Sequence, residues 1–303
     1  MHTESVDTTP HPGPPISMTA PVLTWYAGAA RDLPWRAPGV SPWGVLVSEL
    51  MLQQTPVARV RPVYDAWMRR WPTPAALAAD SPGEAVRAWG RLGYPRRALR
   101  LHAAAVVIVT EHGGQVPSDL VALRALPGVG SYTAAAVASF AFGQRHAVLD
   151  TNVRRVLARV IGGDEFPPAS TTAAETALAE RLSPNDPATA ARWAVAVMEL
   201  GAVVCTARSP HCASCPLRDA CAWRLAGSPP YDGPPRRGQT YAGTDRQVRG
   251  LLLAILRESD GPVPASALDA AWADAAQRAR ALDGLVADGL VEPLAGNRYR
   301  LPH

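Results

Sequence analysis

The chain has 303 residues, of which 48% are hydrophobic and 18% charged, a composition typical of a globular protein with one large or two modest domains. All 30 residues counted as Lys or Arg are Arg, and residues 23–225 carry 21 of them against 15 acidic residues, which favours a polyanionic partner for that part of the chain. No wholly apolar run, Leu251–Leu256 included, is long enough to span a membrane. Without Lys, no side-chain amine is available for a Schiff base.

Residues 1–21 are rich in Pro and lack the basic and apolar stretches of a signal peptide, so we expect a disordered tail. Residues 22–200 show the spacing of successive helices, without the alternating segments of a sheet. Several expected helices begin with a capping residue followed by Pro, at Thr73-Pro74, Ser81-Pro82 and Asp186-Pro187. Glu84 would complete a capping box with Ser81. This part of the chain is predicted to be all-α.

The segment from Trp43 to Gln54 is almost wholly apolar, has helical spacing and contains one acidic residue, Glu49. In such surroundings a carboxyl group is desolvated, which raises its pKa and allows it to hold a proton near neutral pH. The alternative is that Glu49 lies on the one wet face of the helix. The segment alone favours neither.

Leu126–Gly130 separates helical patterns at 118–125 and 131–142. Its Gly128 and Gly130 allow a tight turn, and free amides at the start of the second helix suit a phosphate. This is the pattern of a helix-hairpin-helix, although an ordinary turn between helices has a similar sequence.

Asp150 stands at the entry to a helix rich in Arg, where the helix N-terminus and the guanidinium groups keep a carboxylate ionised. The simpler role of an Asp at this place is an N-cap. Cleavage of a glycosidic bond requires one acid that can donate a proton and one carboxylate that stays ionised. Glu49 and Asp150 would form such a pair.

All four Cys residues lie in one window with the spacing C-x6-C-x2-C-x5-C: Cys205, Cys212, Cys215 and Cys221. Crowded disulfides are disfavoured because the chain shows no sign of secretion. Four thiolates in one loop suit a tetrahedral zinc ion or a [4Fe-4S] cluster, and the single C-x2-C pair favours the cluster.

Residues 227–243 are rich in Pro, Gly and Arg and predict a linker. Beyond it, helical patterns at 244–258, 265–272 and 274–289 precede an expected hairpin at Leu290–Leu301. Three short helices and a hairpin predict a winged-helix-like module over 244–303. Its balanced charge argues against a strong role in DNA binding.

In their order these motifs resemble the helix-hairpin-helix, iron–sulfur DNA glycosylases, and within them the adenine DNA glycosylase (MutY) family. The resemblance implies an all-α, two-lobed glycosylase domain over residues 22–226, with DNA between the lobes and a [4Fe-4S] cluster in the loop 205–221. The matching segments are Leu33–Arg36, Ser48–Thr55, Leu92–Tyr94, Leu126–Gly130, Leu149–Val153, Met198–Ala202 and the four Cys.

The resemblance also implies catalytic roles. Glu49 would protonate adenine at N7, and Asp150 would stabilise the cation that forms on the sugar. Tyr132 and Asn152 would place that carboxylate and the water.

The same resemblance implies contacts with DNA. Gln54 and Tyr94 match residues that fill or wedge the base stack when adenine is flipped out, a step that exposes the reacting bond. Gly128 and Gly130 would hold the DNA backbone without reading bases.

The implied activity is monofunctional hydrolysis in base excision repair, with removal of adenine mispaired with 8-oxoguanine or guanine in double-stranded DNA. We expect a monomer in the bacterial cytoplasm, associated with the nucleoid and not with a membrane. A lyase of the endonuclease III type is excluded, because the Lys of that branch is Tyr132 here. A mismatch-specific thymine glycosylase, which also has Tyr there, and a non-catalytic iron–sulfur DNA-binding protein stay as alternatives.

Three features depart from the family pattern. Pro95 replaces the second residue of a frequent Tyr-Tyr pair, and Val195 stands where many relatives carry Gln near the adenine pocket. Residues 244–303 are also too few for the Nudix-like domain that usually reads 8-oxoguanine. We expect recognition of the oxidised base to depend on the catalytic domain and Tyr94, or to be weaker.

Overall fold

The computed structural model describes residues 17–234 and 241–303. The chain divides into two compact units, each built from segments far apart in sequence. The first unit comprises Met1–Ala30 and Leu149–Tyr231, and the second comprises Arg31–Val148 and Asp232–His303. Most of the expected tail and the centre of the expected linker, residues 235–240, lie outside the described residues.

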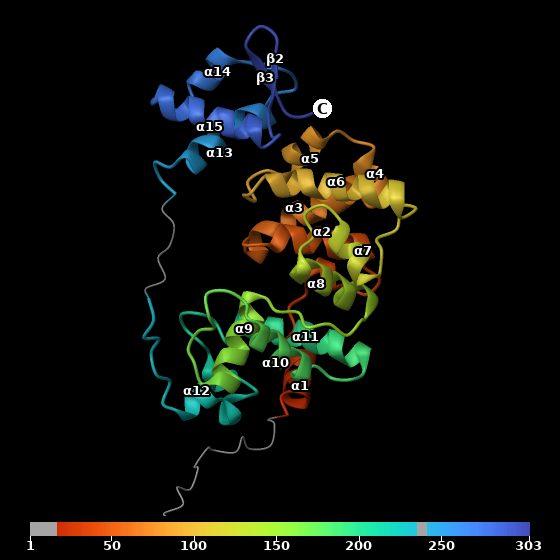
Figure 1. Cartoon of the computed structure of the whole chain (residues 1–303), viewed down its shortest axis with the longest axis vertical. Coiled ribbons are helices and arrows are strands. Elements are labelled where there is room, and N and C mark those ends of the chain that lie inside the picture. The colour runs from red at the N-terminus through yellow and green to blue at the C-terminus, as the bar shows by residue number, and fades with distance from the viewer. Residues whose placement is uncertain (1–16, 235–240) are drawn as a thin grey trace, which may run out of the picture. The chain divides into compact units, whose positions relative to one another are not determined.

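The first unit is helical where it is described, and α11 is central to it because both α1 and α9 pack against it. Helix α9 continues into a π-helical turn over Ala158–Gly162, and two 3-10 turns, Cys212–Ser214 and Arg218–Ala220, lie in the cysteine loop. The helices are α1 (Thr19–Ala29), α9 (Thr151–Leu157), α10 (Ala173–Leu182), α11 (Pro187–Val203) and α12 (Ala222–Leu225) (Figure 1).

Helix α1 begins at Thr19 and buries Val22 completely. The predicted tail is therefore wrong for residues 19–21, which form the first turn of this helix. Pro21 fits there because the first turn of a helix needs no intrahelical N–H donor.

The second unit begins with a 3-10 turn, Pro34–Arg36, and a helical bundle. The bundle helices are α2 (Pro42–Leu52), α3 (Val57–Arg70), α4 (Pro74–Ala78), α5 (Pro82–Trp89), α6 (Arg96–Glu111), α7 (Leu120–Ala125) and α8 (Ser131–Phe142). The unit ends with α13 (Asp245–Glu258), β1 (Val263–Pro264), α14 (Ala265–Asp269), α15 (Ala275–Ala287), β2 (Glu292–Leu294) and β3 (Arg298–Arg300).

The predicted caps at Thr73, Ser81 and Asp186 are confirmed. The side chain of each accepts a hydrogen bond from a backbone N–H in the first turn of the helix that follows, and each helix has Pro at its start. Such a cap satisfies one of the orphan donors at a helix N-terminus.

The predicted capping box at Ser81 is wrong in one of its two hydrogen bonds, because the Ser81 N–H does not donate to the Glu84 side chain. Glu84 bonds instead to Arg70 (2.7 Å) and Arg87 (2.9 Å), and the Ser81 N–H donates to Asp80. The two guanidinium groups attract the carboxylate more strongly than a neutral amide does. A full capping box forms in α10 between Thr172 and Glu175, a pair that the sequence analysis did not single out.

Tryptophans fill much of the core of the second unit. Trp67 packs edge-on against Trp71 and Trp89, with ring centroids 4.6 and 5.7 Å apart. The Trp43 indole N–H donates to the Trp71 carbonyl at 3.0 Å, which joins the start of α2 to the end of α3. This packing fixes α2, the helix that carries Glu49.

Residues 244–303 contain three helices and a terminal hairpin, with one strand more than predicted. The sheet order is β1-β3-β2, both pairs are antiparallel, and Tyr299 lies opposite Val263 on one side and Pro293 on the other. The two-residue strand β1 is too short to show alternation, so only the pairing with β3 defines it. Helix α14 is shorter than the predicted 265–272.

This C-terminal module packs against α5 and α6 within the second unit (Figure 1). The Gly83 N–H donates to the Pro302 carbonyl at 2.8 Å, and Arg257 Nε donates to the Val86 carbonyl at 3.0 Å. Buried side chains of the module belong to the same hydrophobic core as those of the bundle. The module is thus part of the scaffold that carries α5 and α6.

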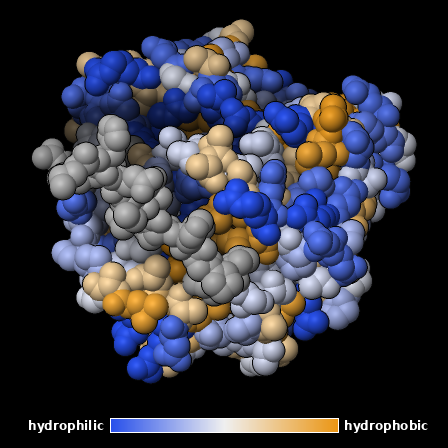
Figure 2. All heavy atoms as spheres, turned by 60° about the horizontal axis from the view of Figure 1, so that its bottom comes forward, coloured by the Kyte–Doolittle hydropathy of each residue, from blue (hydrophilic) through white to orange (hydrophobic). Residues whose placement is uncertain are grey.

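Large exposed hydrophobic side chains on the described residues are few and come from several elements. On the face drawn in Figure 2 they are scattered among hydrophilic side chains. None of the helices within the described ranges combines the length and hydropathy needed to cross a bilayer.

The junction between the module and α5 depends on the missing side chain of Gly83. A Cβ there would lie 2.3 Å from the Pro302 carbonyl oxygen and 3.0 Å from the Leu301 Cβ. We expect Gly83→Ala to lower the free energy of unfolding by about 1–3 kcal/mol, measured by urea denaturation. As a control, Gly28→Ala in α1, where nothing lies within 4 Å, should leave stability unchanged or raise it. Equal effects of the two changes would contradict this account.

Candidate functional site

Glu49 lies in the middle of α2 with only 7% of its surface exposed. All residues of this helix from Trp43 to Met51 are buried, so the alternative of a wet face is wrong. The carboxyl group is therefore held in the desolvated setting that the sequence offered as one of two possibilities.

Helix α2 packs against α8, whose first turn carries Tyr132. The Gln53 amide donates to Thr133 Oγ1 at 3.2 Å and ties the C-terminal end of α2 to the start of α8. Tyr132 is half-buried. Glu49 and Tyr132 thus belong to neighbouring helices of the second unit.

Asp150 is the N-cap of α9 in the first unit. Its Oδ1 accepts from the Val153 N–H at 2.7 Å, and its Oδ2 accepts from Asn152 Nδ2 at 2.8 Å. The N-cap, which is the simpler role of an Asp at this place, is present and leaves the carboxylate in a single orientation. Capping and a catalytic role are therefore compatible in this residue.

Burial raises the pKa of Asp150 above its ordinary value. The hydrogen bonds from Val153 and Asn152 and the charge of Arg155 act in the opposite direction. The helix N-terminus and the nearby Arg side chains, which the local sequence shows, predict a lowered pKa for Asp150, and this direction is wrong. Desolvation depends on packing around the carboxylate, which the local sequence does not show.

Arg155 connects the Asp150 network to the end of α11 and to the cysteine loop. Its Nη2 donates to Asn152 Oδ1 and to the Gly201 carbonyl, both at 2.7 Å, and its Nε donates to the Cys205 carbonyl at 2.7 Å. Asn152 thereby has its amide oxygen fixed, which directs its Nδ2 to Asp150. Arg155 is a functional candidate that the sequence analysis missed.

Gly201 allows this close approach of α9 and α11. A Cβ at this position would lie 2.7 Å from both the Cβ and the carbonyl oxygen of Asn152. Gly201 lies in the Met198–Ala202 segment that matches the family pattern, and the close contact with Asn152 explains why this position is Gly.

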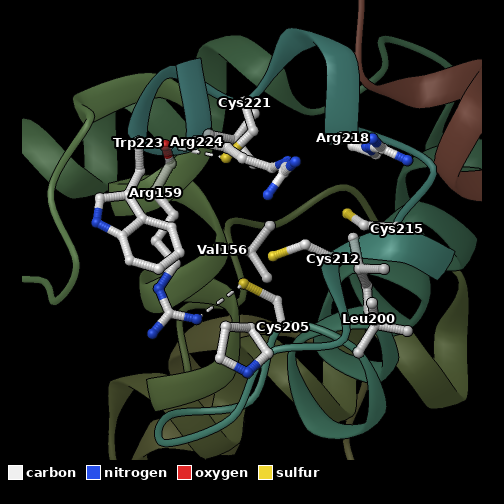
Figure 3. Close-up of a pocket in the computed structure, with 13 residues that line it drawn as sticks. Val156, Arg159, Leu200, Cys205, Cys212, Cys215, Arg218, Cys221, Trp223 and Arg224 are labelled. Atoms are coloured by element: carbon white, nitrogen blue, oxygen red, sulfur yellow. Dashed lines mark hydrogen bonds between the residues drawn. The ribbon is translucent and has the colours of Figure 1, made fainter. Parts of the chain in front are cut away.

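The four Cys side chains line one cavity of the first unit (Figure 3). Cys205 follows α11, and Cys221 precedes α12. Apolar side chains, among them Val156 and Leu200, close the cavity, and Arg159 Nη1 donates to the Cys205 sulfur at 3.4 Å. Arg159 also stacks on Trp223, with its guanidinium carbon 4.7 Å from the ring centroid.

The donor set fits a metal cluster held by thiolates. Burial raises the pKa of Cys205, and that of Cys215 to about 11, so the thiolates need a compensating positive charge. Four thiol side chains around one cavity fit the thiolate ligand set of an iron–sulfur cluster.

Gln54 and Tyr94 lie in two neighbouring loops of the second unit, after α2 and after α5. Both are exposed, Tyr94 by 50%, and both have a left-handed backbone, with φ of 53° and 48°. The Thr55 hydroxyl donates to the Leu92 carbonyl at 3.3 Å and joins the two loops. The sequence predicted both residues as parts of one DNA contact, and the structure places their loops together.

The glycines of the hairpin differ in what they require. Gly128 has a φ of +80°, and a Cβ there would lie 2.8 Å from the Cβ of Arg100. Gly130 is the N-cap of α8 with an extended backbone, and no atom lies within 4 Å of an added Cβ. Only Gly128 is therefore demanded by the turn itself.

The candidate residues are divided between the two units. The second unit carries Glu49, Gln54, Tyr94, Gly128, Gly130 and Tyr132, and the first carries Asp150, Asn152 and the four Cys. Within each unit, the hydrogen bonds and packing contacts given above hold these side chains in place.

We expect Cys221→Ala to abolish the iron–sulfur cluster, because one ligand of four is lost. Iron analysis should find about four irons per chain before the change and a large loss after it. The visible absorption of the cluster should disappear in parallel. Ser214→Ala, in the same loop, should keep both signals, and full iron content in Cys221→Ala would contradict the ligand assignment.

Comparison with known proteins agrees with this geometry. Residues 47–184 match the HhH-GPD superfamily of base excision DNA repair proteins, and residues 205–221 match the iron-sulfur binding domain of endonuclease III. A thymine/uracil-DNA glycosylase of Pyrobaculum aerophilum is 39% identical over 65% of this chain and 86% of its own length. The solved structure of a thermostable thymine-DNA glycosylase has a TM-score of 0.62 and 30% identity, and the match covers 69% of this chain and 95% of that one.

The match to one relative includes nearly every residue, the C-terminal module among them. Adenine DNA glycosylase of Mycobacterium tuberculosis is 56% identical over 301 residues, which is 97% of this chain and 98% of that protein. Together with the helix-hairpin-helix fold and the four-cysteine loop, this identity shows that the chain belongs to the adenine DNA glycosylase family.

Proposed function

We propose that this chain binds duplex DNA and removes adenine mispaired with 8-oxoguanine or guanine, by hydrolysis of the N-glycosidic bond. The observation that carries the proposal is 56% identity to an adenine DNA glycosylase over 97% of the chain. The protein would act as a monomer in a bacterial cell, at the nucleoid, where its substrate lies.

The proposed acid is Glu49, which gives its proton to N7 of adenine as the bond between the base and the sugar C1′ breaks. Its support is the buried position within α2, where only 7% of its surface is exposed. The base leaves as neutral adenine, and the electron deficit passes to the sugar.

Asp150 would stabilise the oxocarbenium-like sugar by its negative charge, and Asn152 would hold this carboxylate in place. The support is the hydrogen bond of 2.8 Å between Asn152 and Asp150 Oδ2. Water then adds to C1′ and gives up a proton, so the products are free adenine and an abasic strand. Tyr132 is proposed to help to place the carboxylate and the water.

The iron–sulfur cluster would be held by the four Cys residues and would fix the conformation of the loop 205–221. The chain's own contribution is the link from this loop to α9, through the bond of Arg155 to the Cys205 carbonyl. Arg208, Arg218 and Arg224 of this region would face the phosphate backbone.

Recognition of the base opposite adenine would depend on the bundle and on Tyr94. The support is that the module over residues 244–303 consists of three helices and a three-stranded sheet, which we take as winged-helix-like and not as a Nudix-like domain. The relative from Mycobacterium tuberculosis matches this module too, which supports a shared architecture.

The test is single-turnover base release from matched duplexes with A opposite 8-oxoguanine, G or T, and with T opposite G. We expect release of adenine to be fastest opposite 8-oxoguanine and the abasic strand to stay intact without heat or alkali. Release of T with A untouched would refute the proposal and favour the thymine glycosylase alternative. Scission at the rate of base release would refute monofunctional hydrolysis.

Asp150→Asn should keep DNA binding and the N-cap, because Asn caps helices as well as Asp does. Base release should fall by about 100-fold or more, the usual scale for loss of an electrostatic group in a transition state. Unchanged release would contradict the role proposed for Asp150, whereas DNA binding without base release in either protein would favour the non-catalytic alternative.

The acid limb of the pH–rate profile should report Asp150. Catalysis needs the ionised carboxylate, so the rate falls as the pH falls through a pKa that burial has raised. Asn152→Ala removes a hydrogen bond that lowers this pKa, and we expect the limb to move to higher pH. Asn185→Ala, an exposed change in the same unit, should leave the limb in place. A shift to lower pH in Asn152→Ala would contradict the assignment.

A further inference from the structure

The two loops that carry Gln54 and Tyr94 both hold a non-glycine residue in the left-handed region. Among the described residues only four non-glycine residues have a positive φ: Gln54, Tyr94, Ser228 and Asn297. Such a conformation is unfavourable for residues with a side chain and persists only where the surroundings enforce it. Something must therefore hold these two loops in place.

One buried guanidinium, that of Arg97, contacts both loops. Its Nη1 donates to the Gln53 carbonyl at 2.6 Å, on the loop of Gln54. Its Nη2 donates to the Gly93 carbonyl at 3.1 Å, on the loop of Tyr94, and to Thr55 Oγ1 at 3.0 Å. The carbonyls flanking both strained residues are thus bound by a single side chain.

The same guanidinium closes the end of α2. Nη1 also donates to the Leu50 and Met51 carbonyls, at 2.8 and 3.1 Å. These carbonyls lie in the last turn of the helix, where no intrahelical N–H reaches them and where a positive charge is favoured. Arg97 therefore ties both loops to the helix that carries Glu49.

The guanidinium also lies against the Tyr94 ring, with its central carbon 5.4 Å from the ring centroid and 5.3 Å from that of Trp89. This contact orients one side of the Tyr94 ring while half of the side chain stays exposed. The exposed half is free to meet a base.

This arrangement carries a cost. Arg97 is 5% exposed, its five hydrogen bonds all go to neutral oxygens, and burial lowers its pKa to about 10. An apolar side chain of similar size would avoid burial of a charge. Only a planar group with several donors can reach these acceptors at once.

We propose that Arg97 is a positioning residue that holds Gln54 and Tyr94 as one preformed wedge for opening the base stack. This inference rests on the proposed function, since it assigns the wedge to base flipping. A rigid wedge inserts without first having to order its loops, so opening of the stack would depend on Arg97 while phosphate binding would not.

The experiment uses full-length protein with 2-aminopurine in place of the target adenine, opposite G. This analogue becomes fluorescent when it leaves the stack. Arg97→Met and Arg97→Lys are built in the Asp150→Asn background, which retains the base, and DNA affinity is measured on the same samples. Lys keeps the charge but cannot span both loops.

We expect both variants to bind DNA within about threefold of the parent, because phosphate contacts dominate affinity. The fluorescence rise should be largely lost in Arg97→Met and reduced in Arg97→Lys. With Asp150 restored, adenine release from A·G duplexes should fall about tenfold or more, since flipping precedes chemistry. Arg70→Met is the matched control, since Arg70 also stacks on a ring (4.4 Å from Trp71) and is hydrogen-bonded, but contacts neither loop. It should keep the full rise.

A full fluorescence rise in Arg97→Met would overturn the inference. Failure of both Arg97 variants to fold, seen as loss of the cooperative thermal transition, would overturn it too and make Arg97 a stability residue. Absence of adenine release by the unsubstituted chain on any duplex would instead refute the proposed function. A loss of the fluorescence rise that is confined to the Arg97 variants supports the role of Arg97 and leaves the proposed function unaffected.

Discussion

Buried guanidinium groups that bond to backbone carbonyls hold the candidate functional residues within each unit. In the first unit Arg155 joins Asn152, the end of α11 and the Cys205 carbonyl. In the second unit Arg97 joins the end of α2 to the loops of Gln54 and Tyr94. Each spans segments more than 40 residues apart in sequence. Removal of either would leave several buried carbonyls without donors, which costs more than the bonds themselves are worth.

This constraint explains how the site tolerates unfavourable local features. Glu49 is a desolvated carboxyl group, Asp150 is a carboxylate whose pKa burial raises, and Gln54 and Tyr94 have strained backbones. Features of this kind gather at functional sites and need rigid support. A Lys ammonium has three donors on a flexible stem and could not satisfy carbonyls from two or three segments at once. In a chain without Lys, Arg is therefore the residue type that both supplies the positive charge and supports the fold.

The C-terminal module belongs to this scaffold. Asp288, at the end of α15, lies 3.2 Å from Arg96, which directly precedes Arg97 in α6. The module also contacts α5 through Gly83 and Val86, and its buried side chains continue the core of the bundle. A module with balanced charge is thus better suited to supporting the helices on either side of the Tyr94 loop than to holding DNA by itself.

The sequence by itself determined the elements that depend on neighbouring residues and the sites that depend on residue type. The caps at Thr73, Ser81 and Asp186, the helix over 131–142 and the thiolate set of four Cys all follow from short-range spacing. Only the tertiary structure decided that Glu49 is buried and that burial raises the pKa of Asp150. It also decided that Arg97 and Arg155 bind backbone carbonyls from distant segments and do not only contribute positive charge. It also decided that Glu84 pairs with Arg70 and Arg87, and that β1 exists. The physical reason is that desolvation, strand pairing and multidentate hydrogen bonding depend on atoms brought together from distant parts of the chain, which no local pattern contains.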